Sequence, residues 1–339
     1  MTSDQIHDIA ARAAYPGQKG PAHVVETHIS WVLLAADYAF KIKKPLQLSF
    51  LDFSTLEQRA HYCEEEVRLN RRLAPDMYLG VLAVQSDSAG QLSIGPFQQG
   101  LPLLDYAVWM RRMDLECQMD RRLSEHAVTS ADMEALAERL AHFHRANVLD
   151  ASGTPIDLAE EYRTDFEDLF ALATVAERLL GETAISSLER WRECVRHFLD
   201  SHQRRLHERT QAGFWVEGHG DLHTGNIFLL PDGPVVFDCI EFDAHLRRLD
   251  VLNELAFLMM DLEARGHAAL AETFFSAYTH HWPCLEGPED ERLLAYFKAY
   301  RANVRLKIAL LLWEQHPQPD HAQSVRLYWD VLERYVAYL

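Results

Sequence analysis

The chain has 339 residues, of which 48% are hydrophobic, so it is long enough for about two domains with a sizeable buried core. The 51 Asp and Glu against 33 Lys and Arg give a formal net charge of −18. Nucleic acid and anionic membranes are therefore disfavoured as partners, because both repel an acidic protein. The sequence shows no secretory leader and no membrane span, and its 5 scattered cysteines read as reduced. This composition is typical of a cytoplasmic enzyme, and it leaves the oligomeric state open.

The first third of the chain predicts strands and one helix. Residues 24–26, 31–34 and 38–43 alternate in hydrophobicity, which predicts an antiparallel meander with a turn at 35–37. Ser54 and Glu57 have the spacing of a capping box and predict a helix that keeps helical periodicity up to Pro75. Two further strands are predicted over 80–85 and 106–110.

After about residue 113 the apolar spacing becomes mostly helical. Helices are predicted over 131–147, around 188–198, over 246–262 and over 293–312, with a β-rich insert at 214–238. Strands followed by helices, without a regular repeat, indicate an α+β fold. We expect two lobes, a small β-rich lobe with one helix over 1–112 and a larger, mostly helical lobe over 113–339.

The β-rich insert holds the most informative motif. The run from His219 to Asn226 contains Asp221 and precedes two apolar strands that flank a turn at 231–234; Asp238 follows the second strand. We expect Asp221, Asn226 and Asp238 to converge. Phosphoryl transfer needs a carboxylate that accepts or orients a hydroxyl proton and oxygen ligands that hold Mg²⁺. Asp221 and Asn226 also have the spacing of the Asp and Asn in H-R-D-x-x-x-x-N.

These residues resemble the catalytic segment of the aminoglycoside phosphotransferase/choline kinase-like family, which shares the protein-kinase fold. Upstream, Ala39-Phe40-Lys41 is similar to the V-A-I-K strand, and Glu66 stands where the family places the helix glutamate that pairs with the strand lysine. The resemblance implies a protein-kinase-like two-lobe fold and a phosphotransferase that uses ATP and Mg²⁺. The implied site has Asp221 as the catalytic residue, Lys41 and Glu66 positioning the nucleotide phosphates, and Asn226 and Asp238 as metal ligands.

Within that superfamily the chain resembles an uncharacterised bacterial branch. The segments that carry this likeness are 26–30, 41–45, 63–75 and 237–242, and the resemblance covers roughly residues 22 to 312. Some members of the branch carry a second ATP-binding domain. No G-x-x-x-x-G-K-[ST] motif occurs in this sequence, so we expect no such domain in the chain.

Two departures from the family pattern affect what is expected of the substrates. No G-x-G-x-x-G precedes Lys41, so backbone N–H groups are expected to cover the nucleotide phosphates less closely than in protein kinases. Ile240 stands where drug-modifying relatives have a glutamate, so drug specificity is not implied. The acceptor is expected to be a small hydroxyl-bearing molecule, such as a sugar, an aminoglycoside or an amino alcohol.

Several other residues have competing interpretations. For Lys41 the competing interpretation is an exposed strand-end lysine, because Lys43 lies on the same strand face and Lys44 follows it; Lys41 is still the lysine expected in the site. His219 and His223 are predicted to be structural, as is Asp250, which is expected to anchor the helix that follows it. Arg301 and Arg305 share a helix face, whereas Lys307 points elsewhere, and solvated salt bridges are expected for both arginines. If they bound substrate instead, the acceptor would carry a carboxylate or a phosphate.

Three alternative functions stay open beside the small-molecule kinase. The first is a catalytically weak nucleotide-binding or regulatory module on the same fold. The second is a metal-dependent hydrolase with His219, His223, Asp221 and Asp238 as zinc or manganese ligands. The third is phosphoryl transfer to a protein hydroxyl.

Overall fold

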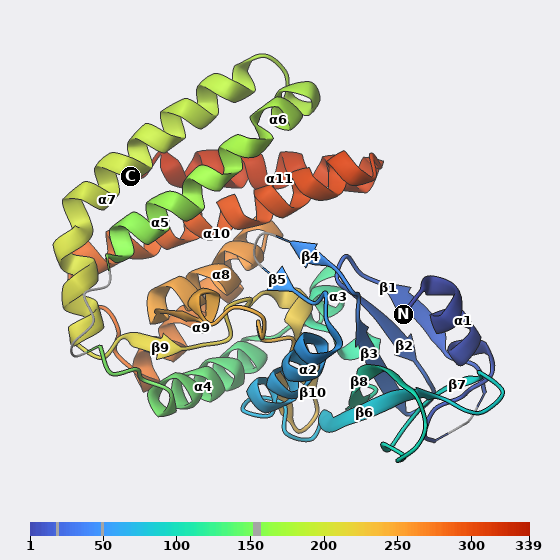
Figure 1. Cartoon of the computed structure of the whole chain (residues 1–339). Helices are drawn as coiled ribbons and strands as arrows, with labels where there is room; N and C mark the ends of the chain where they lie inside the picture. Colours follow the sequence, from blue (N-terminus) through green and yellow to red (C-terminus); the bar gives the residue numbers. More distant parts are fainter. Residues whose placement is uncertain (18–19, 49–50, 152–156) are drawn as a thin grey trace. The chain divides into compact units, whose positions relative to one another are not determined.

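The computed structural model (Figure 1) describes residues 1–17, 20–48, 51–151 and 157–339 of the chain. These residues form two compact units. The first contains residues 1–126 and 225–246, and the second contains residues 127–224 and 247–339. Within the described ranges, no helix has both the length and the apolar character that crossing a membrane requires.

A six-stranded antiparallel sheet forms the centre of the first unit, with strand order β1-β2-β3-β8-β6-β7. The predicted meander and both further strands are confirmed, while β7 was not predicted. The strands are β1 (His23–Glu26), β2 (Ser30–Leu34), β3 (Tyr38–Lys43), β6 (Tyr78–Ser86), β7 (Leu92–Gly95) and β8 (Leu103–Arg111). A smaller pair, β4 (Gln47–Leu48) and β5 (Leu51–Asp52), lies outside this sheet.

Each face of the sheet is covered by one helix. Helix α1 (Ser3–Ala11), which was not predicted, packs with Phe40 and Ile42 of β3 in one apolar cluster. Helix α2 (Leu56–Asn70) packs with Ala39 in a second cluster. Because side chains alternate along a strand, Lys41 and Lys43 share the face of Ala39 and point to the side of α2.

The start of α2 differs from the prediction by one residue. Thr55 rather than Ser54 is the N-cap, and it exchanges hydrogen bonds with Gln58 rather than Glu57. The backbone N–H of Ser54 instead donates to the Asp52 carboxylate at 2.9 Å, which holds Ser54 in the preceding turn. The helix ends at Asn70 and therefore stops short of the predicted end.

The predicted β-rich insert divides between the two units. Strands β10 (Ile227–Leu230) and β11 (Gly233–Val236) form the expected antiparallel hairpin and belong to the first unit, together with α3 (Met119–Ser124). Strand β9 (Trp215–Glu217) belongs to the second unit, where it pairs with β12 (Arg248–Asp250).

The second unit is mostly helical, as predicted. The helices over 131–147 and 293–312 are confirmed, but the helix predicted to begin at residue 246 begins five residues later, because residues 248–250 pair with β9 instead. Helices α5, α6, α9 and α11 were not predicted. The bounds are α4 (Ser130–Ala146), α5 (Leu158–Glu167), α6 (Ala173–Leu180), α7 (Thr183–Gln211), α8 (Val251–Ala264), α9 (Ala268–His281), α10 (Pro288–Gln315) and α11 (Pro319–Val336).

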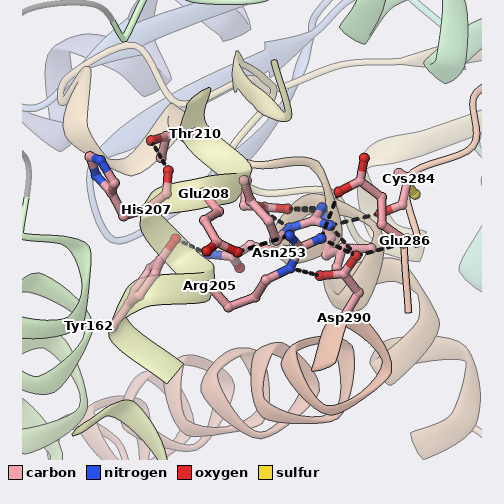
Figure 2. A network of polar contacts seen from close by, with 12 residues as sticks. Tyr162, Arg205, His207, Glu208, Thr210, Asn253, Cys284, Glu286 and Asp290 are labelled. Atoms are coloured by element: carbon pink, nitrogen blue, oxygen red, sulfur yellow. Dashed lines mark hydrogen bonds and ion pairs between the residues drawn. The ribbon is translucent and has the colours of Figure 1, made fainter. Parts of the chain in front are cut away.

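A buried polar network fixes the start of α8, and Figure 2 shows its neighbourhood around Arg205 and Asp290. Asp250 is the N-cap of α8 and accepts a hydrogen bond from the Leu252 N–H at 2.8 Å. Arg209 of α7 donates to both carboxylate oxygens of Asp250, at 2.7 and 2.9 Å. Asp290 joins the network through Arg205 and Arg209. The predicted structural role of Asp250 is confirmed.

Candidate active site

Three of the predicted site residues meet in the first unit. Lys41 lies on β3, Glu66 on α2, and Asp238 two residues after β11. The Nζ atom of Lys41 is 2.9 Å from Glu66 Oε1 and 2.6 Å from Asp238 Oδ1. A strand, a helix and the end of a hairpin thus bring one ammonium group between two carboxylates.

A second lysine takes part in the same cluster. Lys43 Nζ lies 2.7 Å from Glu66 Oε2 and also donates to Glu241 Oε1. The side chains of Lys43 and Glu66 are fully buried, and Glu241 is nearly so. The sequence showed that Lys43 shares a strand face with Lys41, but it did not predict that Lys43 is buried. Its involvement and that of Glu241 were not predicted.

These five side chains form a chain of alternating charge in the order Asp238, Lys41, Glu66, Lys43, Glu241. Burial alone would raise the pKa of Glu66, but the two lysines outweigh burial and lower that pKa to about 2. Burial opposes the charged form of each lysine, yet the adjacent carboxylates raise both lysine pKa values. For Glu241, burial and the negative charge of Glu66 raise the pKa. With all five groups ionised, three carboxylates exceed two ammonium groups by one negative charge.

Asp238 adopts a backbone conformation that is rare for a residue other than glycine. Its φ is +62°, in the left-handed region. Two side chains hold the backbone there: Asp238 N–H donates to Tyr78 Oη at 3.2 Å, and the N–H of Cys239 donates to Asn70 Oδ1 at 2.9 Å. The carboxylate remains partly accessible, with 43% of the side chain exposed. Strain of this kind, held by specific hydrogen bonds, is common at functional sites.

Asn226 lies at the same end of the β10–β11 hairpin as Asp238. The N–H of Phe237 donates to the Asn226 carbonyl at 3.0 Å, so the two site residues flank the last hydrogen bond of the hairpin. An amide and a carboxylate supply the hard oxygen ligands that Mg²⁺ prefers. Asp238 contacts Lys41 through Oδ1, and the cluster carries one excess negative charge. Asn226 and Asp238 thus offer oxygen atoms of the kind a divalent cation prefers, but no group of three or more His, Cys, Asp or Glu side chains among the described residues is placed to hold one.

Asp221 belongs to the second unit, where its loop is held by α8. The Glu254 carboxylate accepts hydrogen bonds from the N–H groups of His219 at 2.8 Å and Gly220 at 3.3 Å. Asp261, two helical turns further along α8, accepts from the Thr224 N–H at 3.0 Å and from its hydroxyl at 2.5 Å. Both ends of the loop are thus fixed through backbone donors. These two acidic residues were not predicted as part of the site.

The two histidines of the motif both interact with Asp221. His219 is fully buried, and its Nδ1 accepts from the Asp221 N–H at 3.3 Å, in agreement with a structural role. His223 Nε2 lies 3.4 Å from Asp221 Oδ2. Burial would raise the pKa of Asp221, but His223, Arg305 and His219 outweigh burial and lower the pKa. The carboxylate is therefore ionised at neutral pH and can accept a hydrogen bond from a hydroxyl group.

The expectation of solvated salt bridges at Arg301 and Arg305 is wrong. Arg301 is buried, with Nη1 donating to the Gly220 carbonyl at 3.0 Å and Nε donating to Asn253 Oδ1 at 2.6 Å. Arg305 donates from Nε to a tyrosine hydroxyl. Arg301 therefore fixes the loop beside Asp221, a role that depends on the packing of α10 against α8. Lys307 does point elsewhere, since it pairs with Asp168.

Residues 48–288 match the family described as Phosphotransferase enzyme family (APH). The chain belongs to this phosphotransferase family. It is 32% identical over 307 residues to uncharacterised proteins of Mycobacterium tuberculosis (strain H37Rv) and Mycobacterium bovis, covering 89% of this chain. The chain spans only 57% of the length of those relatives.

Solved structures show a kinase-like fold for this chain. A choline/ethanolamine kinase family protein from Mesorhizobium loti aligns with a TM-score of 0.54 at 13% identity, over 100% of this chain and 99% of that one. The GDP complex of aminoglycoside 2'-phosphotransferase-IIIa aligns with a TM-score of 0.51 at 12% identity, over 99% of each chain. At these identities the likeness establishes the fold and leaves the acceptor open.

Proposed function

We propose that this phosphotransferase moves the terminal phosphoryl group of ATP to a hydroxyl group of a small molecule, with Mg²⁺ as cofactor. The observation that carries the proposal is the contact of Lys41 with both Glu66 and Asp238. In kinase-like enzymes the strand lysine and helix glutamate form an ion pair that positions phosphates, while an aspartate of this kind holds the metal. Here the lysine lies on strand β3, the glutamate on helix α2 and the aspartate at the end of the β10–β11 hairpin, which are the elements that such a site requires.

Each proposed role follows from the charge and placement of its residue. Lys41 binds the nucleotide phosphates, and Glu66 keeps its ammonium group oriented. Asn226 and Asp238 would hold Mg²⁺, which neutralises phosphate charge when it is bound. Asp221, ionised in the second unit, orients the acceptor hydroxyl and accepts its proton. Catalysis of this type rests mainly on positioning and charge stabilisation.

The turn between β1 and β2 indicates that Lys41 carries a larger share of phosphate binding here than in enzymes with a glycine-rich loop. Thr27 N–H donates to the Ser30 carbonyl at 2.8 Å, and Ser30 N–H donates to Thr27 Oγ1 at 2.9 Å. Lys44 Nζ closes the turn by donating to the Thr27 carbonyl at 2.6 Å. Because these two N–H groups are bonded within the turn, they do not form the open cradle that a glycine-rich loop provides.

The acceptor class remains broad in this proposal: sugars, aminoglycosides and amino alcohols all carry suitable hydroxyl groups. We further propose that the protein acts in the cytoplasm and does not use nucleic acid or a membrane as partner, as its acidic composition indicates.

The test is phosphoryl transfer over a panel of hydroxyl-bearing metabolites, detected as ATP-dependent mass gain of one phosphoryl group. We expect turnover with Mg²⁺, and a loss of about 100-fold or more in Asp221→Asn and in Lys41→Met. A wild-type protein that is stabilised by ATP but modifies no acceptor would instead favour the nucleotide-binding module. Full activity of Asp221→Asn would contradict the proposed role of that carboxylate.

A further inference from the structure

Arg305 stands beside the loop that carries Asp221. It lies one turn after Arg301, which donates to the Gly220 carbonyl at the start of that loop. Its own Nε donates to Tyr328 Oη of α11 at 3.3 Å. Tyr328 Oη in turn donates to Asp261 at 3.4 Å, and Asp261 holds the end of the loop at Thr224. Through these contacts Tyr328 of α11 links Arg305 of α10 to Asp261, the residue that holds the end of the loop.

The guanidinium group of Arg305 is oriented by Tyr328, and, against the effect of burial, the carboxylates of Asp261 and Asp221 lie close enough to raise its pKa. Its carbon lies 5.2 Å from the centre of the Tyr328 ring, so the ring and the Nε hydrogen bond fix its direction. Over the residues that the structure describes, its two terminal amino groups have no hydrogen-bond or ion-pair partner, and the side chain is partly accessible. The charge of Arg305 contributes to the low pKa of Asp221. A fixed cation with two free donors is thus available near this carboxylate.

We propose that Arg305 binds an anionic group of the acceptor, so that the acceptor is a hydroxy acid or a phosphorylated hydroxy compound. The proposal rests on the proposed function, because it assigns Arg305 to the substrate whose hydroxyl group Asp221 orients. The planar fork of a guanidinium group matches the paired oxygens of a carboxylate or phosphate, and such bonds are stronger than neutral ones.

The negative charge of the protein means that an anionic acceptor needs a cation in its binding site. With a net charge of −18, the chain as a whole attracts cations, and Asp221 would repel an anionic acceptor. A local cation is therefore needed if such an acceptor is to bind, and Arg305 supplies one that Tyr328 already orients. A polycationic aminoglycoside would instead place like charge against Arg305. Arg301 cannot serve in this way, because its side chain is buried and bonded to Gly220 and Asn253.

The first experiment compares matched acceptors in the full-length chain: glycerate and glycerol 3-phosphate against glycerol, and an aminoglycoside. We expect turnover of the anionic members. Arg305→Gln should raise the acceptor KM about 10-fold or more and leave the KM for ATP unchanged, with partial rescue by Arg305→Lys. Lys307→Gln removes the same charge two residues away and is the matched control, with no change expected.

The proposal would be overturned if wild type phosphorylated neutral or cationic acceptors as well as anionic ones and Arg305→Gln did the same. A fall in kcat for every acceptor would do the same, since it would place Arg305 on the transferred phosphoryl group.

The second experiment needs no turnover. Phenylglyoxal labelling of arginine, followed by peptide mass spectrometry, should be slowed at Arg305 by glycerate or glycerol 3-phosphate, while the exposed Arg190 serves as the internal standard. Protection by ATP alone, or no protection by any of these anions, would overturn the proposal. If no acceptor is phosphorylated but glycerate protects Arg305, the proposed function fails while the anion site stands, so the two failures are distinguishable.

Discussion

Lys43 and Glu66 form an ion pair that is completely shielded from solvent, with Nζ 2.7 Å from Oε2. Glu66 uses its other oxygen for Lys41, at 2.9 Å. One helix glutamate thus bridges two lysines of one strand face. The two lysines differ in exposure, since 12% of the Lys41 side chain is accessible whereas Lys43 has no accessible surface. This difference predicts different consequences when each is removed.

Replacing Lys43 by Met is expected to reduce stability. The substitution leaves Glu241 buried without its ammonium partner and Glu66 with only one, and breaking a buried ion pair costs about 3–5 kcal/mol. Urea unfolding measures the loss. Lys44→Met is the matched control, because Lys44 pairs with a half-exposed Glu26 and should change stability by less than about 1 kcal/mol. Adding Glu241→Gln should recover part of the loss; equal stability of the Lys43 and Lys44 variants would contradict this account.

Replacing Lys41 by Met is expected to act mainly on catalysis. Glu66 keeps Lys43 as a partner in this variant, so the fold loses less stability than in Lys43→Met. In the proposed site the nucleotide phosphates lose their cation, so kcat/KM for ATP should fall about 100-fold. Steady-state kinetics and urea unfolding of the same preparations give both quantities. The assignment is wrong if Lys41→Met keeps its activity while Lys43→Met, when folded, loses the binding of ATP.

The pH dependence of the free energy of unfolding should reflect the ionisation of Glu66. Its folded pKa of about 2 lies below its ordinary value of 4.5, so the ionised form stabilises the fold above about pH 4.5. That contribution is lost as the pH falls from about 4.5 towards 2. The stability difference between wild type and Glu66→Gln should therefore narrow over this interval in urea titrations. The exposed Glu64→Gln is the control, and a constant difference for Glu66→Gln would argue against the buried ion pairs.

Gly218→Ala should disturb the loop that carries Asp221. A Cβ atom at this position would lie 2.5 Å from Glu254 Oε2, so the carboxylate that holds the loop backbone has to move. We expect kcat to fall by about 10-fold or more, with a smaller change in KM for ATP. Gly95→Ala is the matched control, because nothing lies within 4 Å of its added Cβ. Normal activity of Gly218→Ala would show that the loop tolerates this displacement.

Local patterns in the sequence predicted where several of the candidate site residues lie. Strand alternation placed Lys41 on a definite face, helical spacing selected Glu66, and the hairpin placed Asp238 beside Asn226. Alternation alone does not separate Lys41 from Lys43, since both lie on one strand face; the resemblance to the family selected Lys41, and the difference in burial between the two lysines was not predicted.

Residues whose role comes from distant packing were missed for a different reason. Glu254 and Asp261 read as ordinary acidic positions on an apolar helix, and Arg301 as a surface cation. Their contacts to Gly220 and Thr224 arise only when α8 and α10 pack beside a loop that lies 30 or more residues away in the sequence. Periodicity carries no information on such contacts. The one-residue error at the start of α2 has a local cause, since Ser54 and Thr55 both fit a cap and Asp52 decides between them.

In the proposed site Asp238, held by Lys41, helps to bind the nucleotide together with a divalent metal. Isothermal titration of ATP with and without Mg²⁺, in wild type and in Asp238→Asn, tests it most directly. Wild type should bind ATP at least about 10-fold more tightly with Mg²⁺ than without it, and Asp238→Asn should lose that gain. An unchanged effect of Mg²⁺ in Asp238→Asn, or none in wild type, would contradict the account.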